Sequence, residues 1–479
     1  MSASLAGPGA GRSRAAGWVL VVKFVAAWSL GVVVPVHARE ADRKTAVDTP
    51  NPTGVLRTVV LDPATLDRSN PFFQSLGTNG RACVSCHVPS SGWSLSPAEL
   101  EKRFNDTGGL DPVFRTVDGS NSPKADVSTL EKRRSAFGML LDRGVIRVGM
   151  PIPPEAEFEL VTADDPYGYA SANELSLFRR PLPSTNLRFL TAVMWDGRES
   201  YGPLGTTPIR SDATPQENAA ALIDDLLHQA NDATTGHAEG LALSPADREE
   251  IVQFEMNLAT AQRSSRLAGV LNARGVTGGP ECVAEETFYV TINDVLGADT
   301  SHAPFDAHAM RLFDAWADAA NPHQAAIARG AALFGAPRIS ITGVGGLNDD
   351  LNMTAIPGSC TTCHDSPNLG NHSVALPIDI GITDASRRTP DMPLYTLRNK
   401  ATGLLRQTTD PGRALLTGRW NDIGKFKGPV LRGLAARKPY FHDGSAADLR
   451  DVVEFYDVRF NIGFTKQEKD DLVAFLSAL

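Results

Sequence analysis

The chain has 479 residues, of which 42% are hydrophobic and 21% are charged, a composition typical of a globular protein and a length that favours two domains. Its 46 basic and 55 acidic residues give a net charge of −9. This balance argues against a nucleic-acid partner, which would call for a basic surface.

The N-terminus has the order of regions found in a secretory signal peptide. Two arginines precede an apolar run over residues 17–36, and a small-residue cleavage site ends at Ala38. We therefore predict that residues 1–38 are a signal peptide and that the chain is exported to the periplasm. Lys23 interrupts the apolar run, and a retained membrane anchor, which usually needs about 20 uninterrupted apolar residues, is the alternative.

The next segments combine a linker with a first distinctive motif. Residues 39–68 are polar and contain prolines, so we expect a linker there. After it, Cys83 and Cys86 are separated by two residues and followed directly by His87, which makes a C-x-x-C-H pattern.

Apolar spacing and capping residues predict two helices in the middle of the chain. One covers residues 218–230, and its apolar face consists of Leu222, Ile223, Leu226 and Leu227. The other begins after Ser244, a helix cap that is followed by Pro245 at the first helical position. Residues 264–320 are rich in glycine, aspartate and small residues, and we expect them to cross between two domains.

The last third of the chain repeats the arrangement of helix and motif. A predicted helix begins at Asn321 and leads to a second C-x-x-C-H pattern, formed by Cys360, Cys363 and His364. A final helix begins at Thr465 with a capping-box pattern. Strand patterns are few, so the predicted fold class is mainly α.

Two C-x-x-C-H patterns in one chain indicate covalent haem rather than zinc or a redox dithiol. The paired motifs of a zinc ribbon lie tens of residues apart, whereas most of this chain separates them, and a dithiol does not need the histidine. In haem c the thiols add to the porphyrin vinyl groups and the histidine binds the iron. We predict two covalent haem c groups, held by Cys83, Cys86 and His87, and by Cys360, Cys363 and His364. Cys282 is left over, and we expect an inert thiol there.

Four further segments make the chain resemble the bacterial dihaem cytochrome c peroxidase superfamily, which includes the MauG-type enzymes. They are ARGAALFG before the second motif, MWDGRES at residues 194–200, ATPQENAA at 213–220, and FKGPVLRGLAARKPYFHDGSAADL at 426–449. The resemblance spans roughly residues 70–479, with insertions near 100–170 and 264–320. It implies two cytochrome c-like haem domains with long loops, which we assign to residues 69–263 and 321–479.

The resemblance implies roles for two residues between the motifs. Trp195, in the W-D-G-R block, matches the family's electron-relay tryptophan, and a simple core tryptophan is the alternative. Glu217, in T-P-Q-E, matches the glutamate that moves a proton during peroxide cleavage, with Gln216 as the fallback. The alternative for Glu217 is a first-turn glutamate favoured by the helix dipole.

The iron ligands separate the subfamilies. Because no histidine lies between His87 and His228, the usual distal histidine is missing, and we expect a five-coordinate or water-bound first haem, with His228 and His237 as less favoured ligands. At the second haem, Tyr456 stands where ordinary members have methionine and MauG-type enzymes have tyrosine. A phenolate lowers the haem potential, whereas a thioether raises it. The competing ligands are Met392 and His372, and His442 is expected to order the haem edge.

The resemblance also bears on calcium, partners and activity. Family members bind calcium at the domain junction, but the usual asparagine falls on Arg180 here, which argues against calcium. The sequence predicts a periplasmic oxidoreductase that reduces hydrogen peroxide at the first haem, using electrons from a small c-type cytochrome or cupredoxin. The alternatives are a MauG-type oxidase of a protein or organic substrate and a non-catalytic dihaem electron-transfer cytochrome.

Overall fold

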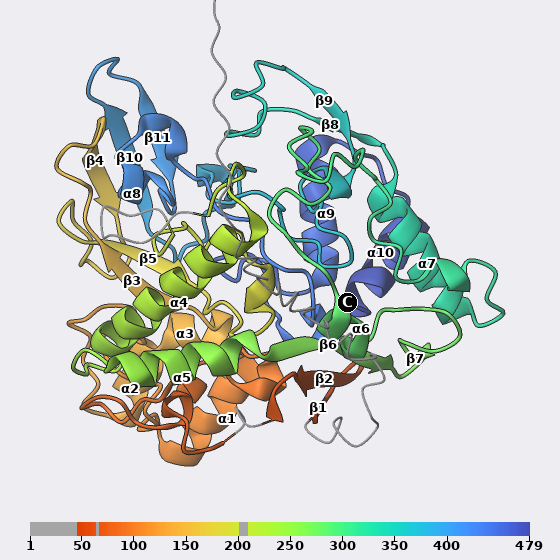
Figure 1. Cartoon of the computed structure of the whole chain (residues 1–479). Helices are drawn as coiled ribbons and strands as arrows, with labels where there is room; N and C mark the ends of the chain where they lie inside the picture. The colour runs from red at the N-terminus through yellow and green to blue at the C-terminus, as the bar shows by residue number, and fades with distance from the viewer. Residues whose placement is uncertain (1–45, 64–66, 201–208) are drawn as a thin grey trace, which may run out of the picture. The chain divides into compact units, whose positions relative to one another are not determined.

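The computed structural model describes residues 46–63, 67–200 and 209–479 (Figure 1). The predicted signal peptide and the first part of the predicted linker lie outside these residues. The described residues all belong to one compact unit, so the division into two haem domains and a crossover remains a prediction. Within the described ranges, no helix has the length and apolar character needed to cross a membrane.

The fold is mixed, which corrects the expectation of a mainly helical protein with few strands. The first difference lies in the predicted linker, where β1 (Ala46–Asn51) and β2 (Gly54–Val60) form an antiparallel hairpin. Strand β2 also pairs with β6 (Leu258–Ser265), and β6 pairs with β7 (Gly269–Val270). Alternate residues of β2 are buried, and this period of two is the physical basis of the strand.

A second group of strands joins segments that are far apart in the sequence. Strand β4 (Phe158–Asp164) pairs with β10 (Leu394–Asn399), which pairs with β11 (Leu405–Thr408). Strands β3 (Ile146–Met150) and β5 (Leu175–Arg179) form a second antiparallel pair. Figure 1 shows these strands gathered at one side of the molecule, where they bury a shared apolar cluster. One of the two predicted insertions therefore folds against the second half of the chain.

The predicted helices are confirmed. Helix α4 (Pro215–His237) contains the predicted segment, and α5 (Pro245–Met256) has Ser244 as its cap. Helix α7 (Pro322–Gly335) precedes the second motif, and α10 (Lys466–Ser477) begins with the expected capping box. The remaining elements are α1 (Pro97–Thr107), α2 (Leu130–Ala136), α3 (Gly138–Arg143), α6 (Pro280–Glu285), β8 (Ile339–Ile341), β9 (Ile356–Gly358), α8 (Ala414–Thr417) and α9 (Leu449–Phe460).

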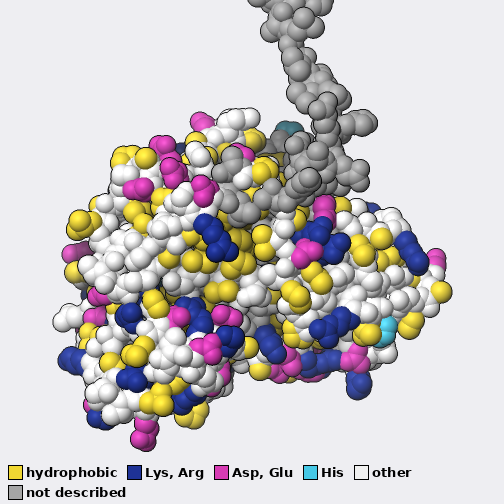
Figure 2. All heavy atoms as spheres, turned by 90° about the horizontal axis from the view of Figure 1, so that it is seen from below, with side chains coloured by type: hydrophobic (Ala, Val, Ile, Leu, Met, Phe, Trp, Pro, Cys, Tyr) yellow, Lys and Arg dark blue, Asp and Glu magenta, His cyan; other side chains and the backbone are white. Residues whose placement is uncertain are grey.

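Close packing of α7, α9 and α10 forms the main core near the second motif (Figure 1). Gly330 allows the approach of α7 to α10, because a Cβ atom there would lie 2.1 Å from the carbonyl oxygen of Asp471. On the surface, Figure 2 shows basic and acidic side chains interspersed over one face of the molecule.

Candidate active site

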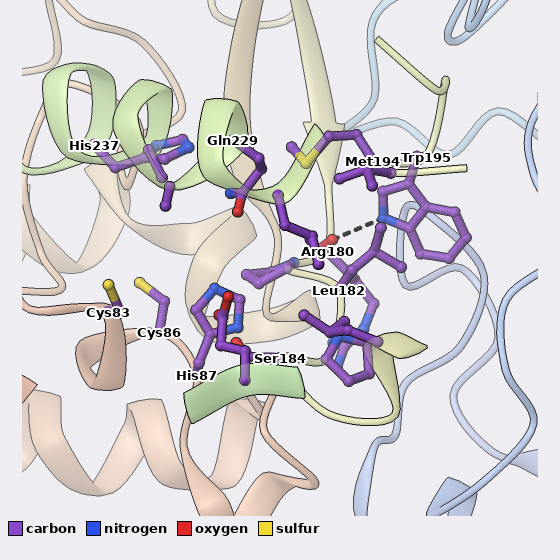
Figure 3. A pocket seen from close by; sticks show the side chains of 18 of the residues that line it. Cys83, Cys86, His87, Arg180, Leu182, Ser184, Met194, Trp195, Gln229 and His237 are labelled. Atoms are coloured by element: carbon purple, nitrogen blue, oxygen red, sulfur yellow. Dashed lines mark hydrogen bonds between the residues drawn. The ribbon is translucent and has the colours of Figure 1, made fainter. Parts of the chain in front are cut away.

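The first C-x-x-C-H motif lines a large cavity (Figure 3). A short 3-10 helix, Cys83–Ser85, turns the chain so that Cys83, Cys86 and His87 all face this space. Nδ1 of His87 lies 3.2 Å from the carbonyl oxygen of Trp93, and burial lowers the pKa of His87 to about 4. When the Nδ1–H group donates to that carbonyl, the neutral ring keeps Nε2 available as a metal ligand.

Helix α4 forms the opposite wall of the first cavity. Its contributing residues share one helical face: Leu226, Gln229, Ala230, Ala233, Thr234 and His237. Figure 3 shows Gln229 and His237 across the space from His87. Nδ1 of His237 lies 2.6 Å from a carboxylate oxygen of Asp118, which also pairs with Arg81. This wall therefore carries one amide and one carboxylate-held imidazole.

The second motif lines a second cavity in the same manner. Cys360, Cys363 and His364 face it, and Nδ1 of His364 lies 2.6 Å from the carbonyl oxygen of Gly370. Tyr456, from α9, also lines this cavity, and burial raises the pKa of its phenol. The hydroxyl of Tyr456 makes no hydrogen bond within the described part of the chain, which leaves its oxygen available to a ligand.

The size of the two cavities suits a large cofactor. The spaces measure about 1570 Å³ and about 1480 Å³, including solvent at their mouths. A haem in each cavity, bonded to the two cysteines of its motif, is compatible with this volume.

The chemistry of the four motif thiols also fits covalent haem. All four are free, and burial raises the pKa of Cys360 and of Cys363 to about 12 and lifts that of Cys83 and Cys86 as well. Each pair of thiols shares its cavity with the histidine of the same motif. This combination of two cysteines and one histidine is the donor set that attaches haem c.

Buried cations around the two cavities fit the anionic side chains of haem. The first cavity is lined by Arg180, Arg432 and Arg437, and Lys427 lines both. Burial lowers the pKa of Arg180 to about 9 and that of Lys427 to about 7. None of the four forms an ion pair with a described carboxylate; each donates to backbone carbonyls instead. A buried cation needs an anionic partner, and the two propionates of a haem supply such partners.

Trp195 lies between the cavities and lines both of them. Its indole N–H donates to the carbonyl oxygen of Arg180 at 2.8 Å, shown by the dashed line in Figure 3. Its ring centroid is 6.4 Å from that of His442, a fully buried side chain in the wall of the second cavity. The predicted relay residue is thus located where a bridge between two cofactors would have to be.

The structure does not bring Glu217 or Gln216 to either cavity. Both are exposed at the start of α4, and the carboxylate of Glu217 accepts hydrogen bonds of 2.8 Å from the backbone N–H and the hydroxyl of Thr214. This arrangement is a capping box, so Glu217 has the position of the first-turn helix glutamate that was the alternative to a catalytic role. Two polar groups that sequence reasoning missed, Gln229 and Glu255, do line the first cavity.

The other residues considered as haem ligands lie in different parts of the structure. Met392 is buried with Met139 and Phe178 and lines neither cavity, whereas His372 lines the second cavity with Nδ1 3.2 Å from Asp365. Neither ring nitrogen of His442 has a hydrogen-bond partner within the described residues. His228 and Cys282 line neither cavity.

At the position expected for a calcium ligand, the guanidinium of Arg180 binds backbone carbonyls. It donates to the carbonyl oxygens of Leu95 and Arg143 at 2.7 Å and to that of Arg437 at 3.1 Å. Carbonyl oxygens of this kind are calcium ligands. Here a protein cation already occupies them.

Comparisons with known proteins point to one family. No protein-family model matches the chain. It is 30% identical over 140 residues to cytochrome-c peroxidase IdrP1 of Pseudomonas sp. (strain SCT), a match that covers 25% of this chain and 36% of that protein. It is 33% identical over 121 residues to cytochrome c551 peroxidase of Nitrosomonas europaea, covering 25% of this chain and 30% of that protein. The chain thus spans about a third of the length of these curated relatives.

Two solved structures to which the chain is similar share little sequence with it. A MauG-like protein associated with microbial copper homeostasis is 14% identical with a TM-score of 0.37, over 88% of this chain and 89% of that one. A variant of the dihaem peroxidase BthA from Burkholderia thailandensis is 18% identical with a TM-score of 0.31, over 90% of this chain and 94% of that one.

Proposed function

The chain belongs to the dihaem cytochrome c peroxidase and MauG family, and from this membership we propose that it is a periplasmic dihaem oxidoreductase that reduces hydrogen peroxide. The observation that carries the proposal is the pair of C-x-x-C-H cavities with Trp195 in the wall of both. The site of peroxide reduction is the first cavity, and electrons enter through the second. The donor is a small c-type cytochrome or cupredoxin, and the similarity to cytochrome c551 peroxidase of Nitrosomonas europaea supports a cytochrome.

The attachment of each cofactor rests on its motif. Cys83, Cys86 and His87 would hold one haem, and Cys360, Cys363 and His364 would hold the other. When bound, the haem irons supply the site of O–O cleavage and the store of electrons. The backbone carbonyls of Trp93 and Gly370 orient the two histidines by accepting from Nδ1.

Proton handling in the first cavity falls to residues of α4. Gln229 lies across the cavity from His87, and its amide can donate to and accept from a peroxide held between them (Figure 3). His237, fixed through Nδ1 by Asp118, presents Nε2 as the proton-holding group. These two residues take the role that the sequence motif assigned to Glu217.

A MauG-type oxidase of a protein or organic substrate is the second candidate, and Tyr456 favours it. Tyr456 lines the second cavity, whereas Met392 is packed elsewhere, so Tyr456 is the side chain that would hold this haem through its phenol oxygen. A phenolate stabilises oxidised iron and favours holding oxidising equivalents over accepting electrons.

Three measurements on the haem-loaded protein separate these functions from a plain electron carrier. A high-spin ferric signal that changes when peroxide is added supports an enzyme, whereas two inert low-spin haems contradict the proposal. Rapid steady-state turnover with a reduced small cytochrome supports the peroxidase. Slow turnover with that donor, together with peroxide-dependent oxidation of a protein or organic substrate, supports the MauG-type oxidase.

A further inference from the structure

Metal-ligand side chains cluster beside the first cavity but outside it. Glu199 comes from the segment after Trp195, and His228 and Asp232 come from α4, where they lie one helical turn apart. One carboxylate oxygen of each acid and one ring nitrogen of His228 lie within 4.8 Å of one another. Nδ1 of His228 is 2.6 Å from Glu199 and 3.9 Å from Asp232.

Asp225 places a buried carboxylate near this cluster, where it interacts electrostatically with Glu199 and His228. It lies one turn before His228 on α4, is fully buried, and neither of its oxygens makes a hydrogen bond within the described part of the chain. Burial, followed by the charges of Asp224 and Glu199, raises the pKa of Asp225 to about 7, although the nearby hydroxyl of Ser200 opposes the shift. Burying an ionised carboxylate without a hydrogen-bond partner is costly, and a cation bound nearby would lower that cost.

The protein's own cations do not balance the cluster. Arg198 is 3.9 Å from Glu199 but also pairs with Asp196, and Arg248, from α5, acts on His228 only at a distance. Ordinary ion pairs of His228 with Glu199 and Asp232 would still leave the buried Asp225 without a hydrogen-bond partner among the described residues.

We infer that Glu199, His228 and Asp232 form a binding site for one divalent transition-metal ion, with the buried carboxylate of Asp225 next to it. One imidazole with several carboxylates is a donor set that suits Zn²⁺ or Mn²⁺. Ligand atoms at about 2.0–2.2 Å from a shared ion are at most about 4.4 Å apart, so the observed cluster needs to contract by only a few tenths of an ångström.

The position of the ion gives it a structural role. It ties the segment that carries Trp195 and Arg198 to α4, whose adjacent face lines the first cavity through Leu226 and Gln229. The site uses none of the haem-attachment residues, so it can be tested without reference to catalysis.

Calorimetric titration of Zn²⁺ into the untagged, haem-loaded full chain, previously stripped with a chelator, tests the inference. One ion should bind per chain without a change in the haem absorption spectrum. Glu199→Gln and Asp225→Asn should each weaken binding by about tenfold or more, a loss typical even of outer-shell changes. Glu249→Gln, an exposed change on the neighbouring helix α5, is the matched control and should bind like the wild type.

Asp232→Asn keeps the test informative if a buried substitution disturbs folding, because this side chain is partly exposed. It too should weaken Zn²⁺ binding. The inference is overturned if the stripped wild type takes up no Zn²⁺, or if a folded Glu199→Gln or Asp232→Asn variant binds the ion as tightly as the wild type.

Discussion

Replacing Trp195 with phenylalanine tests whether this residue connects the two cavities. The substitution keeps an aromatic ring but removes the N–H group that donates to the carbonyl oxygen of Arg180 at 2.8 Å. Losing that bond costs about 0.5–1.5 kcal/mol, and the smaller ring gives up part of its packing against the cluster that contains Ile382 and Phe426. We expect a total loss of about 1–3 kcal/mol, which is less than the roughly 5–15 kcal/mol of a typical domain.

The variant should therefore fold, bind both haems and still react with peroxide at the first haem. Its steady-state turnover with a reduced cytochrome should fall by about tenfold or more, equivalent to at least about 1.4 kcal/mol in the barrier. Stopped-flow absorption and donor oxidation measure the two rates separately. Trp420→Phe is the control, because Trp420 packs against Phe158 and lines neither cavity. Wild-type turnover in Trp195→Phe would refute the relay.

Three further predictions follow from single residues. Tyr456→Met should raise the reduction potential of the second haem by on the order of 0.1 V, which lies within the range of about 0.8 V that axial ligands set. Spectroelectrochemical titration measures this potential. An unchanged potential would contradict ligation by the phenolate. Burial raises the pKa of Glu255 from 4.5 to about 7, so the folded state holds more protons between these values and stability falls as pH rises. Glu255→Gln should remove this pH dependence, so that the free energy of unfolding rises by about 3 kcal/mol at pH 8 and by almost nothing at pH 4. Denaturant unfolding at several pH values measures this difference. If the unfolding free energies of the wild type and the variant change with pH in parallel, the prediction is wrong. Arg180→Met leaves three buried carbonyls without their donor and should lower stability by about 2–4 kcal/mol, seen as a lower denaturant midpoint; an unshifted midpoint would count against this role.

Features encoded within a few neighbouring residues could be predicted from the sequence. The cap at Ser244 and the capping box at Thr465 are local patterns, and the helices begin where these patterns predict. The C-x-x-C-H motifs are equally local, because a single short turn brings both thiols and the histidine of each motif to its cavity. The role of Trp195, in contrast, could be predicted only from the longer W-D-G-R block that the chain shares with the family.

Features that depend on distant pairing could not be predicted. Strand β4 pairs with β10, which lies about half the chain away, and the β1–β2 hairpin is held in place by β6. The motif match at Glu217 carried no information about which side of α4 faces the cavity, and the nearby Thr214 draws its carboxylate into a cap. Gln229 joins the site only because α4 turns that face inward, which no local motif reveals.

The haem content of the purified chain tests the central claim most directly. Acid–acetone extraction removes haem that is not covalently bound, and the pyridine haemochrome spectrum then counts what remains attached. With Cys83 and Cys86 holding one group and Cys360 and Cys363 the other, we predict two equivalents of haem c per chain. One equivalent, or none, would contradict the account.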